Sequence, residues 1–151
     1  MEEMSSMGID DKIQVVRERD DALNARDWDR AFENYSESVV THAPGLEEPL
    51  KGIEATKGWM TPFFNAFGDL KANIVNSFGQ GDWVVVEEEL KGTHTGTLVN
   101  SDGSEIPPTN KTINMWSAEV LKVEEGKITE SRNYFDMLGF MAQLGLTPEN
   151  E

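Results

Sequence analysis

Apolar positions in the first third of the chain repeat with the period of an α-helix. One helix is predicted from Asp10 onward, with Asp10 or Asp11 available as its N-cap. A second helix is predicted directly after Asp27, and aromatic stripes of its kind usually belong to the hydrophobic core. The positions behind these predictions are Ile9, Ile13, Val16 and Leu23 in the first helix and Trp28, Ala31, Phe32 and Tyr35 in the second.

A short apolar strand, residues 39–42, and a third helical segment, residues 52–67, are predicted next. Pro62 lies inside the helical segment and predicts a kink or a break, because proline removes a backbone hydrogen bond. The same segment carries Trp59 and Phe63 among its aromatic residues. We expect these two side chains to face a binding pocket.

Beyond residue 70 the pattern changes to strands that are separated by polar turns. Helices followed by an antiparallel meander indicate an α+β fold. We expect one domain, residues 9–148, behind a disordered tail of residues 1–8. A curved sheet wrapped against helices would leave a conical cavity with an open end, which suits small apolar ligands. Strands are predicted over residues 71–78, 83–97, 111–123 and 127–135, and a short helix over residues 136–144.

The composition narrows the classes of function. The 151 residues include 28 acidic and 13 basic ones, which gives a formal net charge of −15. A surface of this charge repels phosphates and argues against nucleic-acid or anionic-lipid partners. There is no cysteine, and His42 and His94 are the two histidines, so thiolate catalysis is excluded and a metal centre is disfavoured. No secretory signal or membrane-length apolar run is present, and a cytoplasmic location is the default expectation.

Strand alternation indicates which polar side chains face the interior of the sheet. In the last strand, an outward placement of the charged residues turns Asn133 and Phe135 inward. In the long strand of the meander, Glu88 and His94 share a largely apolar face. A buried carboxylate without a partner takes up a proton, which suits it to acid–base chemistry.

Alternatives stay open for these polar residues. Glu88 also fits a strand end that reaches solvent, and His94 also fits a core imidazole with satisfied hydrogen bonds. Glu119 is expected to be exposed, whereas inside the pocket it would supply a carboxylate. Asp136 lies where the last predicted helix begins, and it is either an N-cap or a catalytic acid. His42 ends the first strand, at the mouth of the pocket or on the surface.

A set of short motifs in this order resembles the SnoaL-like polyketide cyclase family, which includes the ester cyclases. The motifs are GTHTG at residues 92–96, IPPTNK at 106–111, EGKI at 125–128, RNYFD at 132–136, LG at 138–139 and QLG at 143–145. The helical first half is similar to the same superfamily more loosely, so the resemblance covers nearly the whole chain.

The resemblance implies a nuclear-transport-factor-2-like fold, a cone-shaped α+β barrel with helices packed on a curved, mixed, mostly antiparallel sheet. It also implies a homodimer that pairs across the sheet, and acid–base chemistry on a small hydrophobic molecule without a metal or an organic cofactor. In the cyclases of this family, an aspartate on the last strand moves a proton during an intramolecular aldol ring closure. This chain departs from that pattern with Asn133, because asparagine cannot exchange a proton near neutral pH.

The last strand is also similar to that of the epoxide hydrolases of this superfamily. Their reaction needs an aspartate at position 133, and an arginine and an aspartate two positions apart on the long strand. This chain has Asn133 and the run EEEL at residues 87–90 instead, so an epoxide hydrolase is disfavoured.

Three functions follow from these observations. The first is an acid–base enzyme of cyclase or isomerase type for a polyketide-like or other apolar carbonyl compound, in which Asn133 hydrogen-bonds the developing enolate. The second is a binding protein without turnover, which Asn133 favours, and the third is a dimeric interaction module with a vestigial pocket. For the enzyme, the predicted catalytic residues are His94, Asn133, Glu119 and Asp136, and the predicted substrate-binding residues are His42, Tyr35, Trp59, Phe63, Glu88, Trp116 and Phe135.

Overall fold

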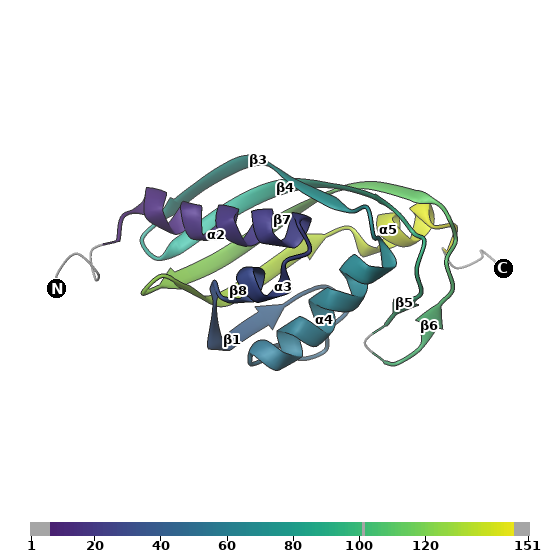
Figure 1. Cartoon of the computed structure of the whole chain (residues 1–151), viewed down its shortest axis with the longest axis horizontal. Helices are drawn as coiled ribbons and strands as arrows, with labels where there is room; N and C mark the ends of the chain where they lie inside the picture. Colours follow the sequence, from purple (N-terminus) through teal and green to yellow (C-terminus); the bar gives the residue numbers. More distant parts are fainter. Residues whose placement is uncertain (1–6, 101, 147–151) are drawn as a thin grey trace.

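The computed structural model describes residues 7–100 and 102–146 of the chain. Within them, the first three helices pack on one face of a six-stranded sheet, and the last helix lies at its end (Figure 1). Residues 1–6 of the predicted tail and residues 147–148 of the predicted domain lie outside the described residues. None of the helices in the described ranges combines the length and the apolar character that a membrane crossing requires. The elements are α2 (Ile9–Asn24), α3 (Trp28–Phe32), β1 (Tyr35–His42), β2 (Leu50–Lys51), α4 (Ile53–Ala66), β3 (Lys71–Gln80), β4 (Trp83–Thr93), β5 (Leu98–Val99), β6 (Glu105–Ile106), β7 (Thr112–Glu124), β8 (Lys127–Phe135) and α5 (Met137–Gln143).

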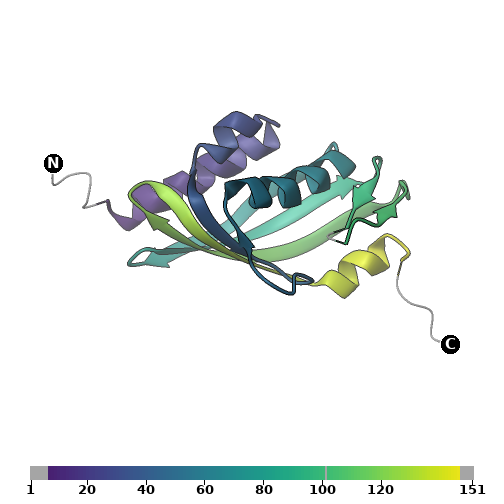
Figure 2. The same ribbon diagram turned by 90° about the horizontal axis from the view of Figure 1, so that it is seen from below.

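The large sheet is mixed and has the strand order β2-β1-β8-β7-β4-β3. β1 runs parallel to β8, whereas the other neighbouring pairs in this sheet are antiparallel. β5 and β6 form a separate antiparallel pair near α4 (Figure 1). The sheet curves beneath α2, α3 and α4 (Figure 2), which confirms the predicted α+β fold with helices on a curved, mixed sheet.

The register of the sheet brings polar side chains of three strands together. Glu119 of β7 pairs with Val86 of β4 on one side and with Asn133 of β8 on the other. Glu88 pairs with Ser117, which lies two residues before Glu119 on β7. The Cβ atoms of directly paired residues lie about 5 Å apart, so these polar groups meet on one inner face of the sheet.

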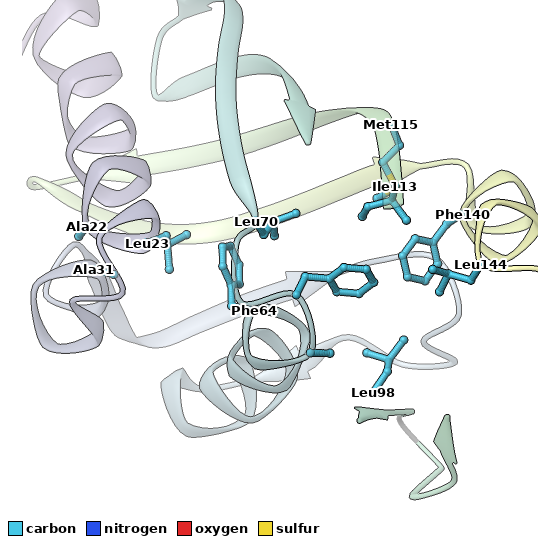
Figure 3. Packing of buried hydrophobic residues seen from close by; sticks show 12 residues of the cluster. Ala22, Leu23, Ala31, Phe64, Leu70, Leu98, Ile113, Met115, Phe140 and Leu144 are labelled. Carbon is cyan, nitrogen blue, oxygen red and sulfur yellow. The ribbon is translucent and has the colours of Figure 1, made fainter. Parts of the chain in front are cut away.

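Two apolar clusters hold the helices on this inner face. The first joins α4 and α5 to the ends of β4 and β7, and Figure 3 shows Phe64, Met115 and Phe140 among its members. The second packs Val16 of α2 and Phe32 of α3 against β4, β7 and β8. Each buried side chain of this size contributes roughly 1.5–3 kcal/mol relative to an exposed one. The clusters therefore fix α2 and α4 over the sheet and leave the region between them to the site.

Two helix boundaries differ from the prediction. α3 ends at Phe32, and Tyr35 starts β1, because the backbone of Tyr35 pairs with Ile128 of β8. α4 is one helix through Pro62, so the predicted break does not occur. The helix tolerates the hydrogen bond that proline removes because its aromatic side packs into the first cluster.

The strand β4 ends at Thr93 rather than near residue 97. The amides of Thr95 and Gly96 both donate to the carbonyl of Ala66, at distances of 3.1 and 3.0 Å, and hold the chain against α4. A Cβ atom at Gly96 would lie 2.9 Å from the backbone oxygen of Asn65, so this approach requires glycine. The short strands β2, β5 and β6 are further elements that the sequence pattern does not predict.

Candidate functional site

A cavity of about 310 Å³ opens between the helices and the inner face of the sheet. Its rim includes the exposed residues Gly45 and Asn100, and most of its wall is apolar. Its polar lining includes side chains that are almost completely buried, so the charged groups lie at the inner end of the cavity. The lining residues that matter below are Arg19, Asp20, Tyr35, Glu88, Glu119, Ser131 and Asn133 on the polar side and Trp59, Phe63 and Phe135 on the apolar side.

The helix α2 supplies a charged pair to this inner end. Arg19 and Asp20 lie three and four residues after Val16 and also precede Leu23 by four and three residues, so the four share one helix face. Val16 and Leu23 are buried in the two apolar clusters, which turns Arg19 and Asp20 toward the sheet. The exposed fractions of Arg19 and Asp20 are 2% and 4%. Burial of this degree requires partners for both charges.

The guanidinium group of Arg19 finds those partners on three elements. Its Nε donates to Oδ1 of Asp20 at 2.8 Å, and its Nη2 donates to Oε1 of Glu119 at 2.7 Å. Its Nη1 donates to the hydroxyl oxygen of Tyr35 at 2.6 Å and to Oε2 of Glu119 at 3.2 Å. Because arginine stays charged inside proteins, it is the counter-charge for the acidic side chains of Asp20 and Glu119.

The hydroxyl group of Tyr35 is a hydrogen-bond donor within the cavity lining. Burial raises the pKa of Tyr35, so the phenol keeps its proton at physiological pH. Its oxygen already accepts from Arg19, and its proton meets Sδ of Met60 at 3.6 Å. A thioether is a weak acceptor, so an oxygen atom of a ligand would be a better partner for this proton.

Ser131 and Asn133 of β8 extend the polar network along the cavity wall. The hydroxyl of Ser131 donates to Oε2 of Glu119 at 2.6 Å and accepts from Nδ2 of Asn133 at 3.1 Å. Nδ2 of Asn133 also donates to the backbone carbonyl of His42 at 3.1 Å. Both amide hydrogens of Asn133 are therefore used inside the protein, and Oδ1 is the group left for a ligand. The predicted hydrogen bond from Asn133 to an enolate lacks a donor in this arrangement.

Glu88 and Asp20 bring two carboxyl groups together at the inner end of the cavity. Oε2 of Glu88 and Oδ2 of Asp20 are both buried, and neither accepts a hydrogen bond from a donor in the described part of the chain. Burial raises the pKa of Glu88 well above its ordinary value of 4.5, and the neighbouring Asp20 and Glu119 raise it further. Glu88 therefore keeps a proton to higher pH than an ordinary glutamate, and it lines the cavity.

Several predicted site residues do line the cavity. The expected exposure of Glu119 is wrong, because Arg19 on α2 pairs with its carboxylate and encloses it. Glu88 does not reach solvent either, since its side chain is 7% exposed. The predicted residues that line the cavity are Tyr35, Trp59, Phe63, Glu88, Glu119, Asn133 and Phe135.

His94 is buried, but it lies outside the cavity lining. Its ring stacks on Phe67 with 5.1 Å between the centroids, and its Nδ1 accepts the amide hydrogen of Thr109 at 3.1 Å. The proton of the neutral ring is therefore on Nε2. Burial lowers the pKa of His94, so it is a neutral imidazole of the core. The predicted place of His94 in the pocket is wrong, because the chain leaves the sheet at Thr93 and turns under α4.

Asp136 and His42 also lie outside the cavity lining. Asp136 is exposed and accepts the amide hydrogen of Gly139 at 2.8 Å, so it is the N-cap of α5 rather than a catalytic acid. The imidazole of His42 faces Glu130, with 3.2 Å between Nε2 and Oε2. The backbone carbonyl of His42, not its side chain, is what contacts Asn133. The sequence predicts that Asp136 is catalytic and that His42 binds the substrate. Both predicted placements are wrong, because neither side chain lines the cavity.

Trp116 lies on the outer face of the sheet, and its side chain is 61% exposed. Alternation along β7 turns Met115, Ser117 and Glu119 inward, and Trp116 between them points outward. The predicted contact of Trp116 with a substrate is therefore wrong.

Sequence reasoning misses Arg19, Asp20 and Ser131, although two signals point to them. Arg19 and Asp20 occupy positions on the apolar face of the first helix, where the helical spacing would otherwise predict apolar residues. A charged pair in such a place predicts a buried, paired site. Ser131 lies two residues before Asn133 on the same strand face, so the inward placement of Asn133 implies that of Ser131.

The inner end of the cavity suits proton transfer. Within the two described ranges, no three His, Asp or Glu side chains gather as ligands of a metal ion would. Arg19 lies between the carboxylates of Asp20 and Glu119 and takes the place that a bound cation would occupy. The cluster holds a carboxylate that can accept a proton and a carboxylic acid that can donate one, beside an apolar wall that limits the entry of water.

Asn133→Asp is expected to lower the free energy of unfolding at pH 7 by about 1–3 kcal/mol. The new carboxylate would replace the amide that donates to the carbonyl of His42 and to Ser131, and it would lie next to Glu119. Denaturant titration measures the change. Asn114→Asp, at an exposed position of β7, is the matched control and should stay close to the wild type. Equal stability of the two variants would contradict the claim that the hydrogen bonds donated by the Asn133 amide stabilise the fold.

Comparisons with known proteins agree on one family. A model of the SnoaL-like polyketide cyclase family matches residues 13–144 of the chain. The chain is 27% identical over 101 residues to nogalonic acid methyl ester cyclase of Streptomyces nogalater, a match that covers 67% of this chain and 70% of that protein. It is 26% identical over 139 residues to aklanonic acid methyl ester cyclase DnrD of Streptomyces peucetius, covering 89% and 90%. A crystal structure described as a SnoaL-like polyketide cyclase from Jannaschia sp. CCS1 matches with a TM-score of 0.82 and 22% identity, covering 95% of this chain and 97% of that one.

Proposed function

Because the chain belongs to the SnoaL-like polyketide cyclase family, we propose that it is a cofactor-independent acid–base enzyme of cyclase or isomerase type. Its substrate would be a small, apolar, polyketide-like carbonyl compound. The observation that supports this proposal is the apolar cavity of about 310 Å³ that ends in buried acidic side chains around Arg19. A cavity of this size and polarity suits a small organic ligand.

The reaction that this arrangement suits is an intramolecular aldol ring closure. A carboxylate removes a proton from the carbon next to one carbonyl group of the substrate, which gives an enolate. The enolate carbon forms a bond to the carbon of a second carbonyl group, and the oxygen of that group takes up a proton. No net proton is consumed, so one acid and one base inside the cavity are sufficient.

The charges of the cluster favour a neutral substrate. Three acidic side chains, Asp20, Glu88 and Glu119, share the single cation of Arg19, so the cluster keeps a net negative charge even when one of them holds a proton. A net negative charge in a site of low dielectric constant repels a carboxylate more strongly than it would in water. We therefore expect the cavity to bind an esterified acid and to reject the free acid.

The test of the proposal uses aklanonic acid methyl ester and its free acid, since a relative is named for a reaction of that ester. The expected product has the mass of the ester and a new retention time and ultraviolet spectrum in liquid chromatography with mass detection. The ester should also raise the melting temperature, and the free acid should bind at least about tenfold more weakly, which corresponds to about 1.4 kcal/mol.

A binding protein without turnover is the second candidate, and Asn133 supports it because this side chain cannot exchange a proton. Thermal stabilisation by the ester without any product, at pH values from 5 to 9, would favour this candidate. Neither stabilisation nor product from neutral polyketide esters would contradict both functions.

We also propose that the chain forms a homodimer across the outer face of the sheet. Large apolar side chains are exposed there, and Phe78, Trp116 and Tyr134 are each more than half exposed in the single chain. These side chains lie at outward-facing positions of β3, β7 and β8, and several large apolar side chains exposed on one face favour contact with a partner. Light scattering coupled to size-exclusion chromatography should give twice the mass of the chain, and Trp116→Glu should shift it toward the monomer. A monomeric wild type at micromolar concentration would contradict the proposal.

A further inference from the structure

The two unpaired carboxylate oxygens at the inner end of the cavity need an explanation. Oδ2 of Asp20 and Oε2 of Glu88 are buried, and no donor in the described ranges reaches either oxygen. Two ionised carboxylates in contact would repel each other strongly in a site of low dielectric constant. One proton placed between them supplies the missing donor and satisfies both oxygens.

The neighbouring charged groups cannot supply that proton or a second positive charge. On α2, Arg19 donates its hydrogen bonds to Oδ1 of Asp20, to Glu119 of β7 and to Tyr35 of β1. The carboxylate of Glu119 is satisfied by Arg19 and by Ser131. The remaining negative charge must therefore be neutralised within the pair of Asp20 and Glu88.

Asn133, at the position where the cyclases of this family have an aspartate, does not supply a proton to Asp20 or Glu88. Asn133 lies on β8, beyond β7 as seen from Glu88, and its two amide hydrogens are held by His42 and Ser131. Asp20 and Glu88 line the same cavity from α2 and β4. The cavity therefore has a titratable pair on the α2 and β4 side and a hydrogen-bond acceptor on the β8 side.

We propose that Asp20 and Glu88 share one proton and act as the catalytic acid–base pair of this cavity, in place of an aspartate at position 133. The pairing itself is independent of the proposed function, and its catalytic role rests on that function. The ionised member of the pair takes a proton from the carbon next to a substrate carbonyl group. The protonated member delivers its proton to the carbonyl oxygen that becomes a hydroxyl group. The pair holds one proton before and after the reaction, so the reaction needs no other reactant.

Arg19 and Glu119 are positioning residues in this scheme. Arg19 holds Oδ1 of Asp20 at 2.8 Å, which directs Oδ2 away from the guanidinium group. Glu119 offsets the positive charge of Arg19, which would otherwise lower the pKa of Glu88 and favour loss of the proton from the pair. Their contribution to catalysis acts through Asp20 and Glu88.

The experiment follows proton abstraction without ring closure. The probe is 2-tetralone, a neutral apolar ketone, and the readout is the exchange of its carbonyl-adjacent protons in deuterium oxide by proton nuclear magnetic resonance. The proteins are the wild type, Glu88→Gln, Asp20→Asn and the matched control Glu87→Gln, which is the same change at the preceding, exposed position of β4. Circular dichroism checks that each variant is folded.

We expect the wild type to accelerate exchange, the control to stay within about twofold of it, and Glu88→Gln and Asp20→Asn to lose at least 100-fold. Carbon-13 titration of labelled glutamate and aspartate side chains should show a carboxylic acid at pH 7 that is absent from Glu88→Gln and present in Glu87→Gln. Glu88→Gln is the decisive variant if Asp20→Asn does not fold, because glutamine keeps the shape and the neutral charge of protonated Glu88.

Exchange by the wild type no faster than in buffer would overturn the proposal, and so would full activity of folded Glu88→Gln. The outcome is separable from that of the proposed function. Exchange of 2-tetralone without cyclisation of polyketide esters would support the pair and contradict the cyclase, whereas cyclisation that survives Glu88→Gln would support the cyclase and contradict the pair.

Discussion

Arg19→Met is expected to lower the free energy of unfolding at pH 7 by about 3–5 kcal/mol, which is the cost of removing one partner from a buried ion network. Arg19 is 2% exposed and makes hydrogen bonds to Asp20, Tyr35 and Glu119. Methionine fills much of the same volume without a charge, so the loss reports mainly on the carboxylates that remain buried without a cation. Urea titration followed by tryptophan fluorescence measures it.

Arg17→Met is the matched control, because Arg17 lies on the exposed side of the same helix and donates one hydrogen bond, to Ser77. We expect this control to change stability by less than about 0.5 kcal/mol. The double variant Arg19→Met, Glu119→Gln should recover part of the loss, since it removes one of the two stranded charges. A loss below 1 kcal/mol for Arg19→Met would show that the carboxylates do not depend on Arg19.

The strands, and the side chains that face inward from them, can be predicted from patterns among residues that are close in the sequence. The strand β8 has the predicted bounds, because its alternation and the turn before it are local features. Alternation along β8 turns Asn133 and Phe135 into the cavity, and alternation along β4 does the same for Glu88. Inward placement on a strand thus needs only the sequence of that strand and the identity of its apolar face.

Other parts of the site depend on contacts between distant segments. The environment of His94 is made by Phe67 and Thr109, which lie on opposite sides of it in the sequence and meet only in the folded chain. The exposure of Glu119 is likewise decided by Arg19, one hundred residues earlier. Alternation cannot predict such partners. The sequence of a strand is the same whether a charged side chain on it is exposed to solvent or is buried against an opposite charge from another element.

Arg19 and Asp20 of α2 are absent from the predicted site for a different reason. Helical spacing places Arg19 and Asp20 on the apolar face between Val16 and Leu23, so their burial is a local prediction. A charged pair on such a face is costly unless another element completes it. The sequence therefore indicates that a partner exists, and the structure identifies Glu119 and Glu88 as that partner.

The hydrogen bonds of this network extend from α2 to β8. From Asp20 the contacts pass through Arg19 to Glu119, then to Ser131 and Asn133. An aspartate at position 133 would add a third ionisable carboxyl group next to Glu119 and would remove the donor to Ser131. Asn133 and the paired carboxyl groups of Asp20 and Glu88 are therefore compatible features of one arrangement.

Glu88→Gln is expected to make the protein more stable than the wild type above pH 4.5, by an amount that grows with pH. Burial and the adjacent Asp20 raise the pKa of Glu88 in the folded state well above its ordinary value of 4.5. The folded wild type therefore keeps a proton that the unfolded chain releases, and its stability falls as pH rises from 4.5 to the folded-state pKa. The slope is about 1.4 kcal/mol per pH unit, the value of 2.303RT.

Glutamine resembles the protonated form of Glu88 in shape and charge, so the two proteins should have similar stability at pH 4.5 and separate above it. Urea titrations at a series of pH values measure the difference, and Glu87→Gln should follow the wild type throughout because Glu87 is exposed. A difference between Glu88→Gln and the wild type that stays constant with pH would mean that Glu88 is ionised in the folded protein. The cavity would then contain no neutral carboxylic acid at Glu88, and the shared proton would have no support.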